Sequence, residues 1–228
     1  MTWLTKFFTS TIGMKVLMAL TGLVLFGFVV VHMLGNFQIF LGPDVYNHYA
    51  ALLQGQKEIL WAARLTLLAS VVLHIVSATV LTLRSKKARP QGYQVNKWLS
   101  GSYAVRTMRF GGVILLAFIV FHLAQFTLGV VAVDGYRACA GSAADFHCFA
   151  YQNFVSGFKN PAVVGFYVVA QAFLGLHLAH GVWSMLRTLG MTNPRHDTLA
   201  RRGATAFGIA MFVGNAIMPI AVLVGVVK

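Results

Sequence analysis

The chain has 228 residues, of which 58% are hydrophobic and only 10% are charged, and its mean hydropathy is +0.73. About a quarter of the residues in a soluble domain are charged, so this composition excludes an ordinary soluble protein. The net charge of +13 could suggest a nucleic-acid partner, but the basic residues flank apolar stretches, so we expect none. The composition predicts an all-α membrane protein with one domain over residues 1–228.

Five apolar stretches are each long enough to cross a bilayer as a helix, which takes about 20 residues. The predicted spans are residues 14–37, 59–83, 110–133, 161–186 and 205–227. The first span is not read as a signal peptide, because it is too long, contains His32 and lacks a small-residue cleavage site. The lipid bilayer is therefore a predicted partner of this chain.

The connection between the first two spans contains a short predicted helix. Pro43 favours a turn and Asp44 a helix cap, and an amphipathic segment continues to Gln54. We expect this segment to lie along the outer interface, where it only bridges two spans or also covers a pocket between them. In the later connections, Pro90 stops any helix after the second span, and Pro161 occupies a preferred first position for the fourth.

The basic residues are unevenly divided between the two sides of the predicted bundle. One set of flanks holds thirteen of the 18: Lys6, Lys15, Arg84, Lys86, Lys87, Arg89, Lys97, Arg106, Arg109, Arg187, Arg195, Arg201 and Arg202. The other holds Lys57, Arg64, Arg137, Lys159 and Lys228. The positive-inside rule predicts a cytoplasmic N-terminus and an external C-terminus. The basic loops set topology alone, or they also dock a soluble subunit or anionic lipid.

The two cysteines, Cys139 and Cys148, both fall in the long loop assigned to the outside. Disulfides persist outside the cytoplasm, so a bond between these residues is permitted and would hold the loop together. Two cysteines with this spacing do not suggest a metal site. Whether they pair stays open from the sequence.

Five of the eight histidines lie inside spans: His32, His74, His122, His177 and His180. An ionisable residue inside a span is costly and by default indicates a function. Counted from the nearest inner basic residue, at about 1.5 Å per helical residue, His74 and His177 both lie roughly 15 Å deep. His122 and His32 lie roughly 20 and 25 Å deep, and His180 only roughly 10 Å. The depths predict an inner pair on spans two and four and an outer pair on spans one and three.

Two imidazoles that face each other in a helix bundle can bind the iron of one haem from opposite sides. Two such levels predict two stacked b haems enclosed by the five helices. The alternatives are isolated imidazoles that hydrogen-bond between helices, and a histidine-lined proton or metal transporter. Proton relays usually include Asp or Glu, which the spans lack, and a zinc path would gather its ligands at one depth.

Several short patterns accompany these histidines along the chain. They are Gly22 through His32-Met33-Leu34-Gly35, Tyr46-Asn47-His48-Tyr49-Ala50, Lys87-Ala88-Arg89-Pro90, Arg106-Thr107-Met108-Arg109 and Leu176-His177-Leu178-Ala179-His180-Gly181. With five spans and a histidine on each of the first four, the chain resembles the dihaem cytochrome b membrane anchor of succinate dehydrogenases and fumarate reductases. The resemblance covers essentially the whole chain, and the histidine positions are its most specific part.

The resemblance implies an anchor in the bacterial inner membrane that binds two b haems and a quinone, expected to be menaquinone. His32 and His122 would bind the outer haem, and His74 and His177 the inner haem, which is the pairing that the depths predict. The expected partners are a flavoprotein subunit, an iron–sulfur subunit and further copies of the complex. Dicarboxylate chemistry would belong to the flavoprotein and not to this chain.

Other residues receive roles from the same resemblance. Arg106, Arg109 and Arg187 lie where haem propionates would emerge, or they serve topology alone. His180 would lie near a propionate or the iron–sulfur subunit, or would make an ordinary polar contact.

An outer quinone site is assigned to Asn36, Asn47, Gln54 and Glu58. Some family members have a carboxylate in this region; here the nearest comparable position is near Gln54, and Glu58 follows one turn later.

Electron transfer in such an anchor can serve succinate oxidation or fumarate reduction, and the sequence does not choose the direction. A related alternative is the dihaem cytochrome b subunit of another quinone-linked enzyme, such as a formate dehydrogenase or a hydrogenase. The subunits that accompany the chain would distinguish these two assignments.

Overall fold

The computed structural model describes residues 2–89, 91, 103–141 and 145–228. Within these residues the chain is helical and contains no strand, apart from a single antiparallel bridge between Ala140 and His147. Five of the helices are long and apolar enough to cross a membrane. The prediction of an all-α membrane protein is therefore confirmed as far as the helical fold and the five helices of membrane-spanning length and composition are concerned. Pro90 and Lys97, to which the sequence assigned a helix stop and an inner-flank charge, lie outside the described residues.

The helices follow the chain in a simple order. The long ones are α2 (Thr11–Asn36), α4 (Lys57–Lys87), α5 (Tyr103–His122), α7 (Pro161–Thr188) and α8 (Asp197–Leu223). The 3₁₀ turn η1 (Phe37–Leu41) extends α2, and the π-helical turn η2 (Leu123–Thr127) extends α5. The short ones are α1 (Trp3–Thr9), α3 (Pro43–Gly55) and α6 (Ala150–Gly157).

Two predicted spans were placed too far along the chain. The third was expected to end at residue 133 but ends with η2 at Thr127, because Gly129 and Ala132 have φ values of 67° and 53°, which no helix continues. The fifth was expected to begin at residue 205 but begins at Asp197. Arg201 and Arg202 in its first turns are typical of a basic loop, but Asp197 in the first turn favours the start of a helix.

Helix starts follow from local side chains. The Ser10 hydroxyl accepts a hydrogen bond from the Gly13 N–H at 2.9 Å, and the Asn160 side-chain oxygen accepts one from the Ala162 N–H at 2.9 Å. Such caps satisfy amide groups that have no partner inside the helix. Proline opens α3 and α7, where its fixed φ suits the first turn.

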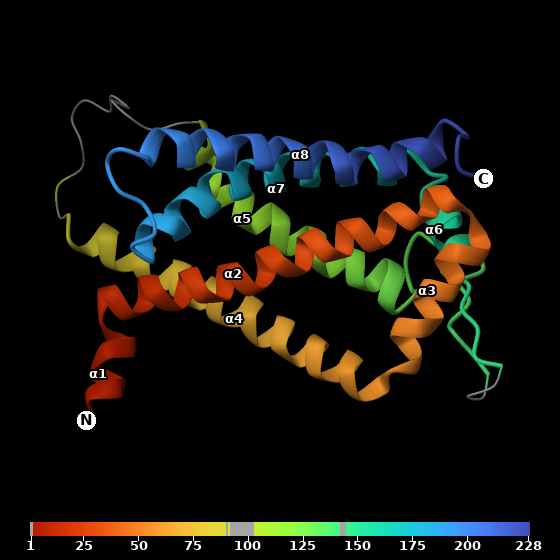
Figure 1. Ribbon diagram of the computed structural model, residues 1–228, viewed down its shortest axis with the longest axis horizontal. Helices are drawn as coiled ribbons and strands as arrows, with labels where there is room; N and C mark the ends of the chain where they lie inside the picture. Colours follow the sequence, from red (N-terminus) through yellow and green to blue (C-terminus); the bar gives the residue numbers. More distant parts are fainter. Residues whose placement is uncertain (1, 90, 92–102, 142–144) are drawn as a thin grey trace.

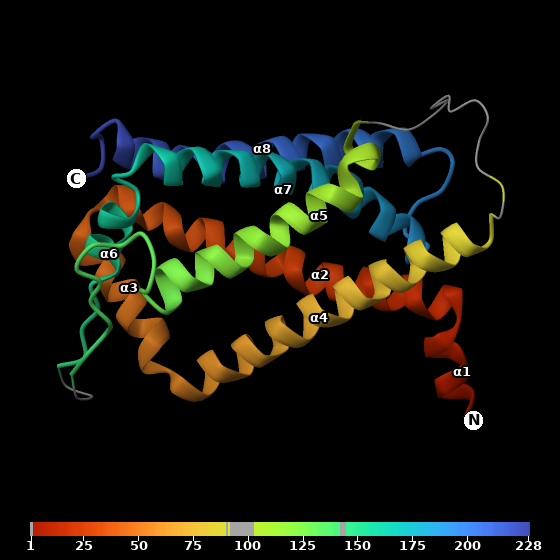
Figure 2. The same cartoon turned by 180° about the vertical axis from the view of Figure 1, so that it is seen from behind.

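The long helices run roughly side by side, and the two chain termini lie at opposite ends of the bundle (Figures 1 and 2). Helix α7 packs against α8, α5 and α2, and α2 packs against α4. We call the end formed by residues 3–15, 84–89, 103–109 and 187–202 the basic end. The opposite end, formed by residues 37–57, 127–141, 145–161 and 223–228, is the disulfide end.

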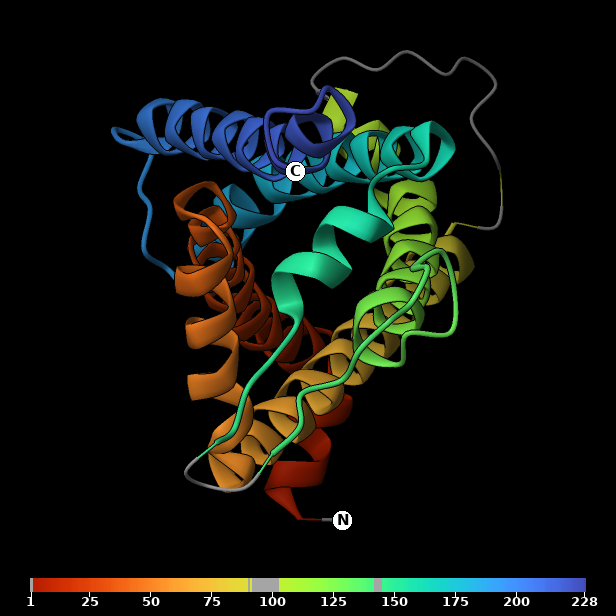
Figure 3. The same ribbon diagram turned by 90° about the vertical axis from the view of Figure 1, so that its right-hand side faces the viewer.

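Most of the large buried side chains lie at the disulfide end, which faces the viewer in Figure 3. Phe158 is 2% exposed and its ring centre lies 4.7 Å from that of Tyr167, which is 5% exposed. Phe154 and Ile39 belong to the same cluster. This cluster joins α6, α7 and η1, and it fixes the end of α5 against them.

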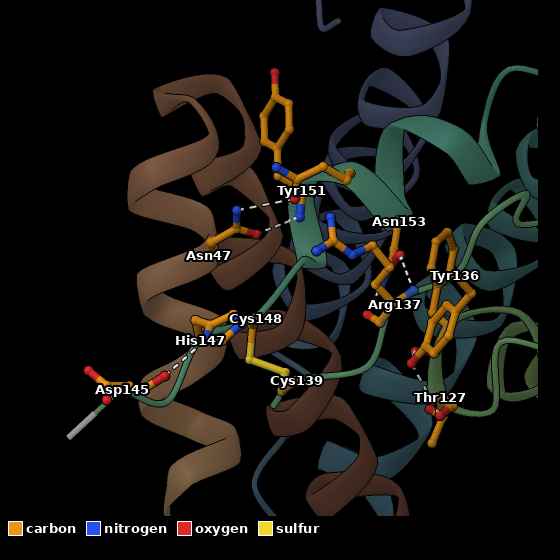
Figure 4. The surroundings of a disulfide bond; sticks show 12 residues. Asn47, Thr127, Tyr136, Arg137, Cys139, Asp145, His147, Cys148, Tyr151 and Asn153 are labelled. Carbon is orange, nitrogen blue, oxygen red and sulfur yellow. Dashed lines mark hydrogen bonds between the residues drawn. A yellow bond between two sulfur atoms is a disulfide. The ribbon is translucent and has the colours of Figure 1, made fainter. Parts of the chain in front are cut away.

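The loop between η2 and α6 is held by a disulfide between Cys139 and Cys148 (Figure 4). The Arg137 N–H donates to the Asn153 side-chain oxygen at 3.0 Å, and the Asn153 amide donates back to the Arg137 carbonyl at 2.8 Å. The Arg137 guanidinium lies 3.4 Å from the ring centre of Phe149. The loop is therefore anchored to α6 by covalent, polar and cation–π contacts.

Helices α7 and α8 come into close backbone contact where two glycines meet. A Cβ atom built on Gly175 would lie 2.8 Å from the carbonyl oxygen of Gly208, and one built on Gly208 would overlap the carbonyl oxygen of Gly175. Small residues allow this close approach of backbones in membranes. This contact holds α7, the most connected helix, against α8.

We predict that Gly208→Ala lowers the melting temperature of the purified protein, because the added methyl group overpacks this contact at a cost of about 1–3 kcal/mol. The matched control is Gly203→Ala on the same helix, where a Cβ atom meets no described atom within 4 Å. The control should keep or slightly raise the melting temperature, since Ala favours a helix over Gly by about 1 kcal/mol. Equal melting temperatures for both variants would contradict the proposed contact.

Candidate functional site

The structure brings the four span histidines together as two pairs. His32 on α2 and His122 on α5 have ring centres 5.8 Å apart. His74 on α4 and His177 on α7 have ring centres 6.2 Å apart. Each pair joins helices that come from different parts of the chain. We call the first the outer pair, toward the disulfide end, and the second the inner pair, toward the basic end.

The spacing within each pair suits two imidazoles bound to one metal ion. Imidazole nitrogens bind metal ions at about 2.0–2.1 Å, so two rings on opposite sides of one ion have centres about 6 Å apart. Among the described residues, no group of three or more His, Cys, Asp or Glu side chains forms a metal site. Each pair thus offers two ligands, which suits a metal whose other ligands come from a macrocycle.

His122 is held by a chain of hydrogen bonds that the sequence analysis missed. Its Nδ1 lies 3.0 Å from the Tyr167 hydroxyl oxygen, and the Tyr167 hydroxyl donates to Oε1 of Gln125 at 2.7 Å. The Gln125 amide group donates to the carbonyl oxygens of Gly157, at 3.0 Å, and Ala132, at 3.3 Å. Gln125 is fully buried, at 0% exposed.

His74 has a simpler partner. Its Nδ1 lies 3.1 Å from the Met18 carbonyl oxygen and 3.3 Å from the Thr21 hydroxyl. A carbonyl oxygen only accepts, so the proton of His74 is on Nδ1 and its Nε2 carries a free lone pair. That form is the one a histidine takes when Nε2 binds a metal and the other ring nitrogen donates to a neighbouring acceptor.

Two buried polar atoms of α7 have no hydrogen-bond partner within the described part of the chain. They are Nδ1 of His177 and Oε1 of Gln171. A buried polar atom without a partner costs about 1–3 kcal/mol. At His177 this atom belongs to a ring whose centre lies 6.2 Å from that of a second imidazole, so the structure buries a costly polar side chain beside His74. Gln171 was not assigned a role from the sequence.

Trp183 is the centre of a polar cluster that joins α7 to the start of α8 at the basic end. Its N–H donates to Asp197 at 2.9 Å, and the Arg187 and Arg201 guanidinium groups lie 5.2 and 4.1 Å from its ring centre. Both arginines also pair with Asp197, at 3.9 and 3.6 Å. The His180 ring centre lies 5.8 Å from that of Trp183. Arg187 and His180 therefore both contact Trp183, and His180 belongs to neither histidine pair.

A second basic feature lies between the end of α4 and the start of α5. A hollow of about 330 Å³ is lined by Ser85, Lys86, Arg89 and Arg109. Three cations and a hydroxyl around one hollow favour an anionic group. This position is compatible with the predicted role of Arg109 near a propionate. Arg106, the other arginine given this role on α5, is exposed at the same end.

Two of the four residues assigned to quinone binding, Asn36 and Asn47, have their polar atoms hydrogen-bonded within the protein. The Asn36 amide donates to the His32 carbonyl at 2.7 Å, and its side-chain oxygen accepts from the Tyr46 hydroxyl. Burial, with a smaller contribution from Tyr49, raises the pKa of Tyr46, so this hydroxyl keeps its proton. The polar atoms of Asn36 therefore bind α2 to α3.

Asn47 is likewise used inside the protein. Its side-chain oxygen accepts from the Tyr151 N–H at 2.9 Å, and its amide donates to Gln152 at 3.2 Å (Figure 4). Gln54 lies in the last turn of α3 and is half-buried, whereas Glu58 is exposed in the first turn of α4. No signal in the sequence separates an asparagine that binds a ligand from one that joins two helices.

A hollow beside α3 was not predicted. It has a volume of about 530 Å³ and is lined by Gln38, Asp44, Val45, His48, Tyr49 and Leu52. Its lining is mainly apolar, with a carboxylate and an imidazole four residues apart on one helix. The spacing of Asp44 and His48 would have indicated a shared helix face.

Fold and site together define a five-span helical membrane protein with two facing pairs of histidines inside the bundle. Comparison with models of protein families, with curated proteins and with solved structures finds no match to this chain.

Proposed function

We propose that this chain is the membrane anchor and electron-transfer subunit of a succinate:quinone oxidoreductase, with its paired histidines as axial ligands of two b haems. The observation that carries the proposal is the presence of two histidine pairs with ring centres 5.8 and 6.2 Å apart in otherwise apolar helices. Bound haem would supply an iron centre that accepts and releases one electron at a time. The protein supplies the ligands, their hydrogen bonds and an interior from which water is excluded.

The proposed orientation follows from charge. The basic end would face the cytoplasm of a bacterium and contact the iron–sulfur subunit, which in turn would carry the flavoprotein. Lys86, Arg89 and Arg109 around one hollow, and Arg201 beside Trp183, give this end a positive surface. Such a surface would attract an acidic face of a partner. The loop with the disulfide would then face the oxidising side, where such bonds persist.

The proposed quinone site is the hollow beside α3. A quinone ring is apolar with two carbonyl oxygens, and its reduction by two electrons takes up two protons. The apolar lining of the hollow suits the ring, and Asp44 and His48 are groups that can donate and receive those protons. Menaquinone is the proposed substrate at this site.

The haem assignment predicts a reduced b-type absorption spectrum and two haems per purified chain. His32→Ala and His122→Ala should each remove the same haem, and His74→Ala and His177→Ala should each remove the other. His180→Ala is the matched control on α7 and should retain both haems, because its ring belongs to neither pair. A colourless wild-type protein would refute the assignment and would favour a transporter.

The partner assignment predicts that a flavoprotein and an iron–sulfur protein copurify with the chain from its native membrane. The complex should oxidise succinate and reduce a quinone analogue. Copurification of a formate dehydrogenase or hydrogenase subunit instead would overturn this assignment and leave the haem assignment intact.

The quinone site predicts that Asp44→Asn lowers quinone reduction by the purified complex about 10-fold or more, as expected when an acid–base group is lost. Haem content should stay unchanged. The matched control is Asp134→Asn, which lies at the same end of the bundle outside the hollow. Equal effects of the two substitutions would exclude Asp44 as a proton-exchanging group.

A further inference from the structure

The hydrogen-bond chain from His122 to Gln125 has a fixed direction. The Gly157 and Ala132 carbonyl oxygens only accept, so the amide nitrogen of Gln125 faces them and its oxygen faces Tyr167. The Tyr167 hydroxyl proton is used in the bond to that oxygen. The Tyr167 oxygen therefore accepts from Nδ1–H of His122, and Nε2 of His122 is left with its lone pair.

The local fold places Gln125 for this task. The turn η2 is π-helical: the Leu128 N–H bonds to the Leu123 carbonyl, five residues earlier, at 2.9 Å. Such wide turns in helices often occur at functional sites. The amide of Gln125 is tied to Gly157, at the end of α6, so the chain of hydrogen bonds has a fixed backbone anchor.

The inner pair has a looser arrangement, in which the longer of the two contacts of His74 is made by a hydroxyl. Nδ1 of His74 lies 3.1 Å from the Met18 carbonyl oxygen and 3.3 Å from the Thr21 hydroxyl, which donates its own proton to the Leu17 carbonyl at 2.8 Å. Nδ1 of His177 has no partner in the described part of the chain. A hydroxyl whose own proton is already donated is polarised and becomes a better acceptor. His122 has the shorter hydroxyl contact, at 3.0 Å, and its hydroxyl partner is linked to a second side chain that is itself hydrogen-bonded to the backbone.

We propose that Tyr167 and Gln125 are positioning residues that hold His122 in its Nδ1–H form and make its Nε2 a stronger electron donor. An acceptor at Nδ1 raises the basicity of a ligating histidine. A more basic ligand stabilises the oxidised state of a bound metal, so these residues lower the midpoint potential at the outer pair. The inference rests on the proposed haem binding.

Redox titration of the purified complex, followed by the haem absorption bands, tests this role. Tyr167→Phe removes the acceptor and should move one midpoint potential upward, while both haems are retained. The moved midpoint should be the one that disappears in His32→Ala. Gln125→Met removes the polarising partner and should move the same midpoint upward by a smaller amount.

The matched control is Tyr136→Phe. The Tyr136 hydroxyl donates to the Phe126 carbonyl at 3.2 Å, so this variant also loses a hydrogen bond to η2 but not one to His122. It should leave both midpoints unchanged. An equal shift in this control would mean that disturbance of η2, and not the acceptor at His122, sets the potential.

The outcomes separate the two proposals. Unchanged midpoints in Tyr167→Phe with both haems present overturn the positioning role and leave haem binding intact. A wild-type protein without haem refutes the proposed function itself. If Tyr167→Phe loses the outer haem, Gln125→Met decides: an upward shift of that midpoint supports the role, and no shift overturns it.

Discussion

The interior of a bilayer contains no water to hydrogen-bond with a polar side chain, and this constraint governs the protein. Each imidazole in a span must find its partners among other protein groups or a bound ligand. His122 finds a tyrosine hydroxyl and His74 a backbone carbonyl. The four rings also lie side by side as two separate pairs, each of which joins two helices. The helices are therefore arranged around a small number of polar contacts in an apolar setting.

The long helices differ in how much of their surface is buried against their neighbours. Helix α8, which has no histidine, is the most buried of the five long helices, whereas α2 and α4, which carry His32 and His74, are the least buried. The close glycine contact fixes α8 behind α7, so α7 has a firm backing on one side. The helices α2 and α4 pack mainly against each other. One half of the bundle is tightly packed, and the other leaves more of its helix surface uncovered.

The sequence was sufficient for features that depend on length and hydropathy. Five spans follow from five long apolar stretches, and the two histidine pairs follow from the distance of each histidine to a flanking cation. The sequence was insufficient where backbone conformation overrides composition. The apolar residues after Thr127 are typical of the end of a span, but the positive φ values at Gly129 and Ala132 are incompatible with a helix, so the span ends at Thr127.

Polar side chains were the least predictable part of the site. Asn36 and Asn47 were assigned to a ligand, yet their polar atoms join α2 to α3 and α3 to α6. Gln125 and Tyr167 received no role, because they lie on different helices and neither forms a recognisable motif with His122. A hydrogen bond between distant segments depends on which faces meet, and hydropathy does not encode that. The hollow beside α3 was missed for the same reason.

Helix α7 contributes to both histidine levels, through Tyr167 at the outer pair and His177 at the inner pair. Tyr167 and His177 are ten positions apart, which separates the two levels by about 15 Å along one helix. An insertion or deletion of one residue between them would turn one end by about 100° relative to the other. The segment from Tyr167 to His177 therefore cannot gain or lose a single residue, while the loops at either end of α7 are free to vary in length.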